Sequence, residues 1–383
     1  MKSKVFSRIG DVPEEAWDAL SAQGSITMSR AFWSVVEQSD LNDFTYRHVL
    51  FLENDDTPSG IVSFYSVTTD IAIFAPKAVR SLLNVVRMVW PGFLKLKMLE
   101  CGTPVTITSP PFVSASSRER LLTSIMDVLQ QSARREGHLL IILRDFEANA
   151  QELRSPLQKR GYHWIESLPN TYMNIAWTSP EAYRQSMRSY YRSKLQKHLK
   201  RNVEAGVHHV LVDDFADMAD TLCRQWMVVH THAKEFQREV LTPEFYRTLS
   251  ENMGSDSKVL LFYRDAVLVG HALLLMDGQV LRWLYVGREV AANDSLYIYI
   301  AYTVVETAIL LGAKQLEMGL TTYAIKQDLG AEVVPIQMAL RATWGFINPF
   351  VGLGYRLLNH IPDTHPRPVF KAANTEETRH ARR

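Results

Sequence analysis

The chain has only two cysteines, Cys101 and Cys223, among its 383 residues. Two cysteines so far apart exclude a disulfide framework and a zinc site built from several thiolates. The sequence also lacks an uncharged apolar run of the roughly 18 residues that a membrane-spanning helix needs. Its first residues contain no apolar core of signal-peptide length. We therefore expect a cytoplasmic globular protein.

The sequence has no excess of charge of either sign. Its 42 Lys and Arg residues nearly balance 41 Asp and Glu residues, which gives a formal net charge of +1. No overall field therefore attracts nucleic acid or an anionic membrane, although local fields remain open. The sequence contains no phosphate-binding loop ending in Gly-Lys-Ser/Thr, no Gly-x-Ser-x-Gly and no His-Glu-x-x-His. We expect no metal site.

One pattern occurs twice along the chain. Residues 49–65 and 259–275 each combine a strand, a charged turn, a glycine and a second strand. Later in each half, a strand is followed by a short helix that ends at glycine and then by another strand. The same order repeated indicates a tandem duplication. The predicted divisions are 1–170, 171–360 and a polar tail at 361–383.

The two halves differ in one predicted feature. The strand VLRWLYVG (280–287) is followed by a polar loop and a long apolar helix, and we find no equivalent pair in the first half. A helix N-terminus has free N–H groups that bind an anion or polarise a carbonyl. We therefore expect the second domain to be catalytic. The first is expected to be a degenerate copy that helps to wall the acceptor site.

Residues 317–335, EMGLTTYAIKQDLGAEVVP, form the most informative stretch. They predict a strand end, a polar turn, a short helix, a stop at Gly330 and a new strand, VVPIQMALRA. This sequence motif resembles the FemAB-like and BioF2-like branch of the GNAT acyltransferase superfamily. The resemblance implies an α/β fold of tandem GNAT-like (acyl-CoA N-acyltransferase) domains, with mixed, mostly antiparallel sheets flanked by helices.

The resemblance also implies an enzyme. An N-acyltransferase would move an acyl group from an acyl thioester, either acyl-CoA or a carrier protein, to an amine on a small molecule or on a cell-wall or natural-product precursor. A FemAB-like aminoacyltransferase using aminoacyl-tRNA is the first alternative, and a non-catalytic precursor-binding protein is the second. In the catalytic readings the donor is a co-substrate, and no tightly bound cofactor is implied.

Four residues are candidates for catalysis: Lys326, Tyr323, Glu317 and His271. Lys326 and Tyr323 lie three residues apart, on one face of the short helix, where they could polarise a carbonyl and donate a proton. Glu317 ends a buried strand, where burial would raise the pKa of a carboxylate and make it a base. His271 lies within an apolar strand, and it is either a core histidine, which we favour, or a neutral base.

Donor binding is expected around the start of the long helix. The candidates are Arg288, Asn293 and Ser295, together with an aromatic wall of Trp283 and Tyr285. The usual CoA-binding pattern has a basic residue followed by closely spaced glycines. Arg288 is followed by alanines instead, so no glycine allows a pyrophosphate to approach the backbone closely. This departure favours a charged tRNA as the donor.

The helix at 188–201 is strongly basic. We predict that Arg188, Arg192 and Lys197 bind an anionic part of the donor or acceptor, because its six cations lack acidic neighbours. A solvated helix face is the alternative. The expected buried stripe is Tyr191, Leu195, Leu199 and Val203.

The stretch 77–97 carries five cations and no acid. One alternative is peripheral membrane contact through its apolar face. The other, which we favour, is that this face covers the core of the first domain.

Overall fold

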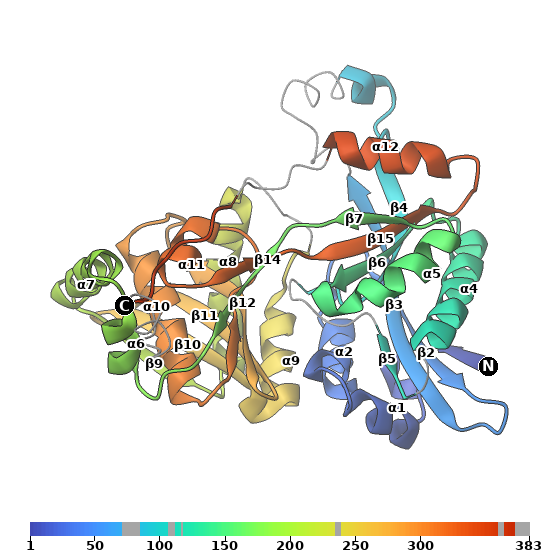
Figure 1. Ribbon diagram of the computed structural model, residues 1–383. Coiled ribbons are helices and arrows are strands. Elements are labelled where there is room, and N and C mark those ends of the chain that lie inside the picture. The colour runs from blue at the N-terminus through green and yellow to red at the C-terminus, as the bar shows by residue number, and fades with distance from the viewer. Residues whose placement is uncertain (71–84, 106–111, 116–117, 234–238, 359–363, 372–383) are drawn as a thin grey trace, which may run out of the picture.

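Two helix-flanked sheets lie side by side in the computed structural model (Figure 1). It describes residues 1–70, 85–105, 112–115, 118–233, 239–358 and 364–371. The first sheet has the order β1 (Lys2–Phe6), β2 (Thr45–Leu52), β3 (Pro58–Asp70), β4 (Lys95–Cys101), β6 (Leu140–Phe146), β15 (Gln337–Ala342) and β7 (His163–Glu166), with β5 (Phe112–Ser114) beside β3. The second has the order β9 (Val207–Val212), β10 (Ser257–Arg264), β11 (Val267–Asp277), β12 (Val280–Arg288), β13 (Gln315–Glu317), β8 (Asn170–Asn174) and β14 (Glu332–Val334).

The two orders correspond strand for strand. Neighbouring strands in these orders are antiparallel except for one pair in each sheet. The parallel pair is β4 with β6 in the first sheet and β12 with β13 in the second. The predicted fold class, tandem domains with mixed and mostly antiparallel sheets, is therefore confirmed. The expectation that β12 has no counterpart is wrong, because β4 takes its place in the first sheet. Its Lys95 and Lys97 alternate with apolar residues, and we had assigned them to a basic surface segment instead.

The last strand of each repeat, β8 in the first and β15 in the second, lies in the sheet of the other repeat. After β7 the chain crosses into the second sheet as β8, and after β14 it crosses back into the first sheet as β15. The crossing segments touch, since Ser167 N donates to Ile336 O at 2.8 Å. The predicted strand VVPIQMALRA is thus two strands, which are interrupted at Pro335, a residue without an N–H for a ladder. The division at residue 170 remains a proposal.

Helices cover both sheets (Figure 1). Those of the first half and the chain end are α1 (Glu14–Ser21), α2 (Arg30–Gln38), α4 (Arg118–Glu136), α5 (Arg154–Lys159) and α12 (Asn348–Leu358). The others are α6 (Pro180–Ser186), α7 (Ser189–Glu204), α8 (Ala219–His232), α9 (Pro243–Met253), α10 (Ser295–Leu310) and α11 (Tyr323–Asp328). Ser29 caps α2 by accepting a hydrogen bond from Phe32 N. Residues of α2 and α9 belong to one apolar cluster, so the halves share a core.

Part of the predicted tail packs on the second half. Val369 is buried, and the Phe370 ring lies 4.9 Å from that of Trp177. Gly330 makes room for Phe370, because an added Cβ there would lie 2.2 Å from the phenyl ring. Gly330 also has φ +98°, so a side chain at this position would be disfavoured twice.

Residues 85–94 do not cover the core of the first domain, contrary to the reading we favoured. Met88, Val89 and Trp90 are exposed, and the chain then enters the sheet as β4. Residues 77–84 lie outside the described part of the chain. Within the described ranges, we find no helix with the length and apolar character needed to cross a bilayer.

Candidate active site

A cavity opens where two neighbouring strands of the second sheet separate. β12 and β13 pair only through Val280–Arg282 and Gln315–Glu317. Beyond this point the chain turns away through Gly319, Thr321 and Thr322, whose φ angles are +73°, +66° and +45°. Left-handed backbone at a non-glycine residue costs about 1 kcal/mol or more, and such strain gathers at functional sites. The gap holds a cavity of about 180 Å³.

The cavity has an aromatic wall and a polar floor. Its lining includes Trp226, His230, Glu239, Trp283, Leu284, Tyr285, Tyr297, Gly319, Thr321 and Lys326. Trp283 Nε1 donates to Tyr285 O at 3.0 Å, and Tyr285 Oη donates to Glu239 Oε1 at 2.7 Å. The structure therefore brings together Lys326, Trp283 and Tyr285 of the predicted site residues.

Lys326 is the most unusual group in this wall, because its side chain is only 3% exposed. Its Nζ donates to Gly319 O at 2.9 Å and to Leu320 O at 2.7 Å. Burial lowers its pKa to about 7, although nearby Glu317 acts in the opposite direction. A charged Lys326 has a third N–H, and a neutral one has a lone pair, so near neutral pH it can either donate to or accept from a ligand in the cavity.

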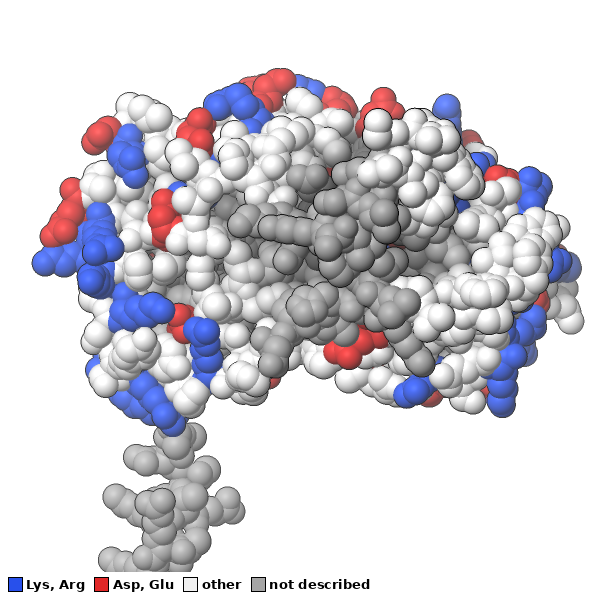
Figure 2. Space-filling model, turned by 90° about the horizontal axis from the view of Figure 1, so that it is seen from above, with Lys and Arg blue, Asp and Glu red and all other residues white. Residues whose placement is uncertain are grey.

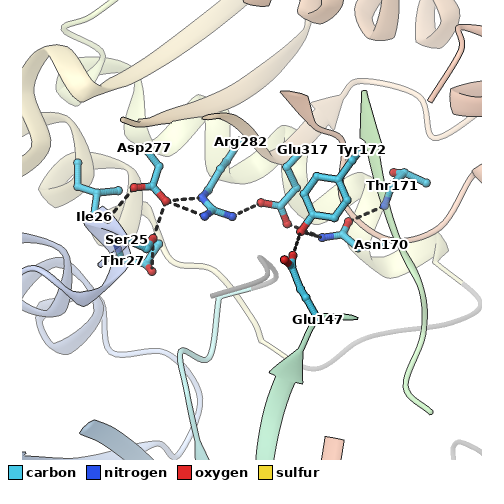
Figure 3. Close-up of polar contacts among 10 residues, drawn as sticks. All are labelled: Ser25, Ile26, Thr27, Glu147, Asn170, Thr171, Tyr172, Asp277, Arg282 and Glu317. Atoms are coloured by element: carbon cyan, nitrogen blue, oxygen red, sulfur yellow. Dashed lines mark hydrogen bonds and ion pairs between the residues drawn. The ribbon is translucent and has the colours of Figure 1, made fainter. Parts of the chain in front are cut away.

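Glu317 belongs to a buried charge network at the closed end of the gap (Figure 3). Its Oε1 accepts from Asn170 Nδ2 at 2.5 Å, and its Oε2 is paired with Arg282. Arg282 also donates to Asp277 Oδ2 through Nε at 2.9 Å and Nη2 at 2.6 Å. The structure thus pairs the Glu317 carboxylate with Arg282 and Asn170, and its predicted role as a base remains a prediction.

The same network reaches the first half of the chain. Asp277 Oδ2 accepts from Ser25 Oγ at 2.6 Å, and its Oδ1 accepts from Ile26 N at 2.8 Å. On the other side, Tyr172 Oη donates to Glu147 Oε1 at 2.6 Å. Figure 3 shows these groups in one row across the two halves. Breaking a buried ion pair by removing one partner is strongly destabilising, so this row holds the halves in one arrangement.

Two other candidates lie away from the cavity lining. His271 is fully buried between Tyr246 Oη at 3.1 Å and Gln225 Oε1 at 3.0 Å. Burial lowers its pKa to about 3, so the imidazole is neutral and fits the core reading that we favoured. Tyr323 donates its hydroxyl to Pro169 O at 2.9 Å. Neither residue is among those that line the cavity, and their catalytic roles remain predictions.

The start of α10 is already occupied by a carboxylate. Asp294 caps the helix, because its Oδ1 accepts from Tyr297 N at 3.0 Å. Arg288 is buried and binds Asp294 at 2.9 Å. Ser295 Oγ lies 2.9 Å from His198 Nδ1, and Asn293 is exposed. An anionic cap competes with a phosphate for the same N–H groups, so donor binding at Arg288, Asn293 and Ser295 remains a prediction.

The basic helix α7 has fewer free cations than its sequence suggests. Arg188 and Arg192 donate to the backbone carbonyls of Phe370 and Met187, both at 3.2 Å, whereas Lys197 is exposed. Basic side chains gather at the end of the molecule where α7 lies (Figures 1 and 2). Val203 is exposed, contrary to the predicted stripe, and Asn202 is buried instead. Anion binding by Arg188, Arg192 and Lys197 remains a prediction, which the salt dependence of substrate binding would test.

The sequence reading missed a charged pair at the end of β6. Asp145 has φ +63°, and its Oδ1 lies 3.7 Å from Arg144 Nη2. Its buried Oδ2 has no hydrogen-bond partner among the residues that the structure describes. Burial raises its pKa to about 6, with Arg144 opposing and Glu100 adding to the rise. The sequence IILRDF could have indicated this site, because an arginine and an aspartate interrupt an otherwise apolar strand near its end.

This pair connects the first half to the cavity. Burial alone would lower the pKa of Arg144. The pKa lies above its ordinary value because of electrostatic interactions, in decreasing order, with Asp145, Glu100, Glu239 and Tyr285. Glu239 and Tyr285 line the cavity. The first half therefore supplies charged groups beside a cavity that the second half forms. In the described ranges, no group of three or more His, Cys, Asp or Glu side chains is placed to hold a metal ion.

We predict that Lys326→Met changes how stability depends on pH. The pKa of Lys326 falls from 10.5 to about 7 on folding, so between these values the unfolded chain binds one more proton and wild-type stability rises with pH. The free energy of unfolding of the wild type minus that of the variant should rise by roughly 2 kcal/mol from pH 7 to pH 9. Urea unfolding at both pH values measures this, with exposed Lys314→Met as the control. A difference that does not vary with pH would contradict the assignment.

Comparison with known proteins supports this reading of the fold. The profile of the FemAB-like family, described as peptidoglycan biosynthesis and recognition, matches residues 8–322. The "Putative 8-amino-7-oxononanoate synthase 2" of Mycobacterium tuberculosis strain H37Rv is 26% identical over 319 residues, which cover 81% of this chain and 41% of that protein. The chain thus spans less than half the length of this curated relative.

Solved structures show the same fold at low sequence identity. FemX has a TM-score of 0.55 and 13% identity, with coverage of 88% of this chain and 97% of FemX. The C-terminal domain of a "Putative Lysylphosphatidylglycerol Synthetase" from Agrobacterium fabrum has a TM-score of 0.54 and 11% identity, with coverage of 89% and 94%. Because the family profile extends over most of the sequence and the fold agrees with that of FemX, the chain belongs to the FemAB-like family.

Proposed function

We propose that the chain transfers an acyl or aminoacyl group to an amine, and that the reaction takes place in the cavity between β12 and β13. The observation that carries this proposal is the buried Lys326, whose Nζ lies at the cavity wall with its pKa lowered to about 7 by burial. Membership of the FemAB-like family is consistent with this chemistry. The activity named for the mycobacterial relative is not part of the proposal, since the match covers 41% of that protein.

The reaction requires no covalent bond to the protein. The acceptor nitrogen attacks the carbonyl carbon of a thioester or ester, a C–N bond forms, and the C–S or C–O bond breaks to release a thiol or hydroxyl. Lys326 would donate an N–H to the oxyanion of the tetrahedral intermediate. Cys223 and Cys101 are poor nucleophiles, because burial raises the pKa of Cys223 to about 11 and that of Cys101 further still.

Asp145 is suited to accept the proton that the amine loses. With a pKa raised to about 6 by burial, it is ionised at neutral pH and is a stronger base than an ordinary carboxylate. Its unpartnered Oδ2 leaves one oxygen for an ammonium or amine. The acceptor would then lie between Asp145 of the first half and the cavity of the second.

The donor is a co-substrate, and the start of α10 bears on which one. A CoA thioester would place its pyrophosphate near a helix N-terminus that Asp294 already occupies. An aminoacyl ester of tRNA needs no phosphate at that point, so this observation favours the aminoacyl donor over acyl-CoA or a carrier protein. The family description and the neighbouring structures suggest a peptidoglycan or lipid precursor as the acceptor.

We predict that Lys326→Ala lowers kcat by at least about tenfold, because removal of one oxyanion donor commonly costs this much or more. The assay supplies labelled aminoacyl-tRNA or acyl-CoA with a panel of amine acceptors. Lys314→Ala removes an exposed lysine and should retain full activity. A folded, fully active Lys326→Ala variant would refute the assignment. If the wild type binds a precursor but turns over no donor, the protein is a binding module instead.

A second variant tests the proton acceptor. Wild-type kcat/KM should rise with pH through about 6, the pKa to which burial raises Asp145. Asp145→Asn should lower the rate and remove that rise. Asp127→Asn changes an exposed aspartate and should retain the wild-type profile. An Asp145→Asn variant that keeps the wild-type pH dependence would contradict the role of Asp145 as proton acceptor.

A further inference from the structure

We propose that one end of the molecule docks on a lipid bilayer that contains anionic phospholipid. The docking surface consists of residues 85–93 and residues 344–353, two segments that are distant in sequence. It lies on the first sheet and does not depend on the proposed transferase activity.

Residues 85–93 present apolar side chains to solvent from an anchored position. Met88, Val89 and Trp90 are 84%, 90% and 63% exposed. Arg87 holds this segment in place, because it makes a bidentate ion pair with Asp70 at 2.6 and 2.5 Å and also donates to Phe93 O at 3.0 Å. The apolar side chains therefore project from a fixed turn.

The helix α12 and the two residues before it have apolar side chains on two sides. Val351 and Tyr355 of the helix and Ile347 before it recur every four residues and pack on the core. Phe350 and Leu353 of the helix and Phe346 before it are 71%, 59% and 77% exposed. A helix that is apolar all round is normally buried. This chain buries only one face, so the outer face is available to a partner.

The two segments leave the sheet at the same end. Leu139 N donates to Lys97 O at 2.8 Å, and Thr343 N donates to Leu139 O at 2.9 Å. Leu139 thus links Lys97, which follows residues 85–93, to Thr343, which precedes α12. Figure 1 shows both segments at the top of the molecule. In the view from above, most charged side chains lie near the outline, and the described atoms between them are largely uncharged (Figure 2).

Basic residues outnumber acidic ones around this surface, and the carboxylate that contacts its first segment, Asp70, is paired with Arg87. The sequence has no Asp or Glu from 71 to 99, where it has five cations, and none from 333 to 362, where it has two arginines. Exposed Lys95 and Lys97 flank the first segment. Exposed aromatic and aliphatic side chains with adjacent cations are the composition that binds anionic membrane interfaces.

A bilayer fits this surface better than a second copy of the chain does. In a symmetric dimer each patch meets an identical patch, so exposed Lys95 and Lys97 of one copy would face the same lysines of the other, while Asp70 is already paired with Arg87. Anionic head groups supply the missing negative charge, while Trp90 and Phe350 enter the boundary with the acyl chains.

The test is co-sedimentation of the full chain with vesicles of phosphatidylglycerol and phosphatidylcholine in equal parts, and with vesicles of phosphatidylcholine alone. We expect binding to the anionic vesicles and much weaker binding to the neutral ones. Val89→Ser with Trp90→Ser should lower the affinity by about tenfold or more, since each side chain loses apolar burial. Phe350→Ser with Leu353→Ser should have a similar effect.

The matched control is Val267→Ser with Leu310→Ser, which removes side chains that are 63% and 71% exposed on the second half. This variant should bind vesicles like the wild type, and all three should keep the wild-type thermal midpoint. Absence of vesicle binding by the wild type would overturn the proposal, as would equal loss in the control. A dimer in lipid-free solution that the Val89 and Phe350 variants dissociate would also overturn it, in favour of a second copy.

Discussion

The exchange of strands between the two sheets is the constraint on which the active site depends. β13 pairs with both β12 and β8, and beyond it the chain follows β8 for one more residue, because Met318 N donates to Thr171 O at 2.8 Å. Arg282 and Glu317 close the gap at one end, and the left-handed turn at Thr321 and Thr322 opens it at the other. The cavity is therefore a consequence of how the halves are joined. A hinge motion between them would break sheet pairing on both sides.

Burial in this joined structure moves two titratable groups toward neutrality from opposite directions. The pKa of Lys326 falls to about 7, and that of Asp145 rises to about 6. Desolvation disfavours the charged form of each, which is the usual way in which a site obtains an acid and a base that work near pH 7. Lys326 comes from the second half and Asp145 from the first, so the proposed chemistry needs both copies.

Local patterns in the sequence were sufficient for much of the fold. The hairpins β2–β3 and β10–β11 and the stop at Gly330 depend on neighbouring residues and were predicted. The partner sheet of β15 could not be predicted, because an alternating apolar strand does not specify its neighbours, and β15 lies between β6 and β7. Asp145 was missed for a related reason, since its raised pKa arises from tertiary burial. The ion pair between Glu317 and Arg282 could not be predicted either, because the two residues lie 35 positions apart in sequence.

The central claim is that the donor carbonyl binds in the second half, beside Lys326. The most direct measurement is a crystal structure of the protein with a non-hydrolysable aminoacyl or acyl donor analogue. The account predicts the donor carbonyl oxygen within hydrogen-bond distance of Lys326 Nζ, with the acyl group against Trp283 and Tyr285. A donor seated within residues 1–165, with the cavity between β12 and β13 empty, would contradict it.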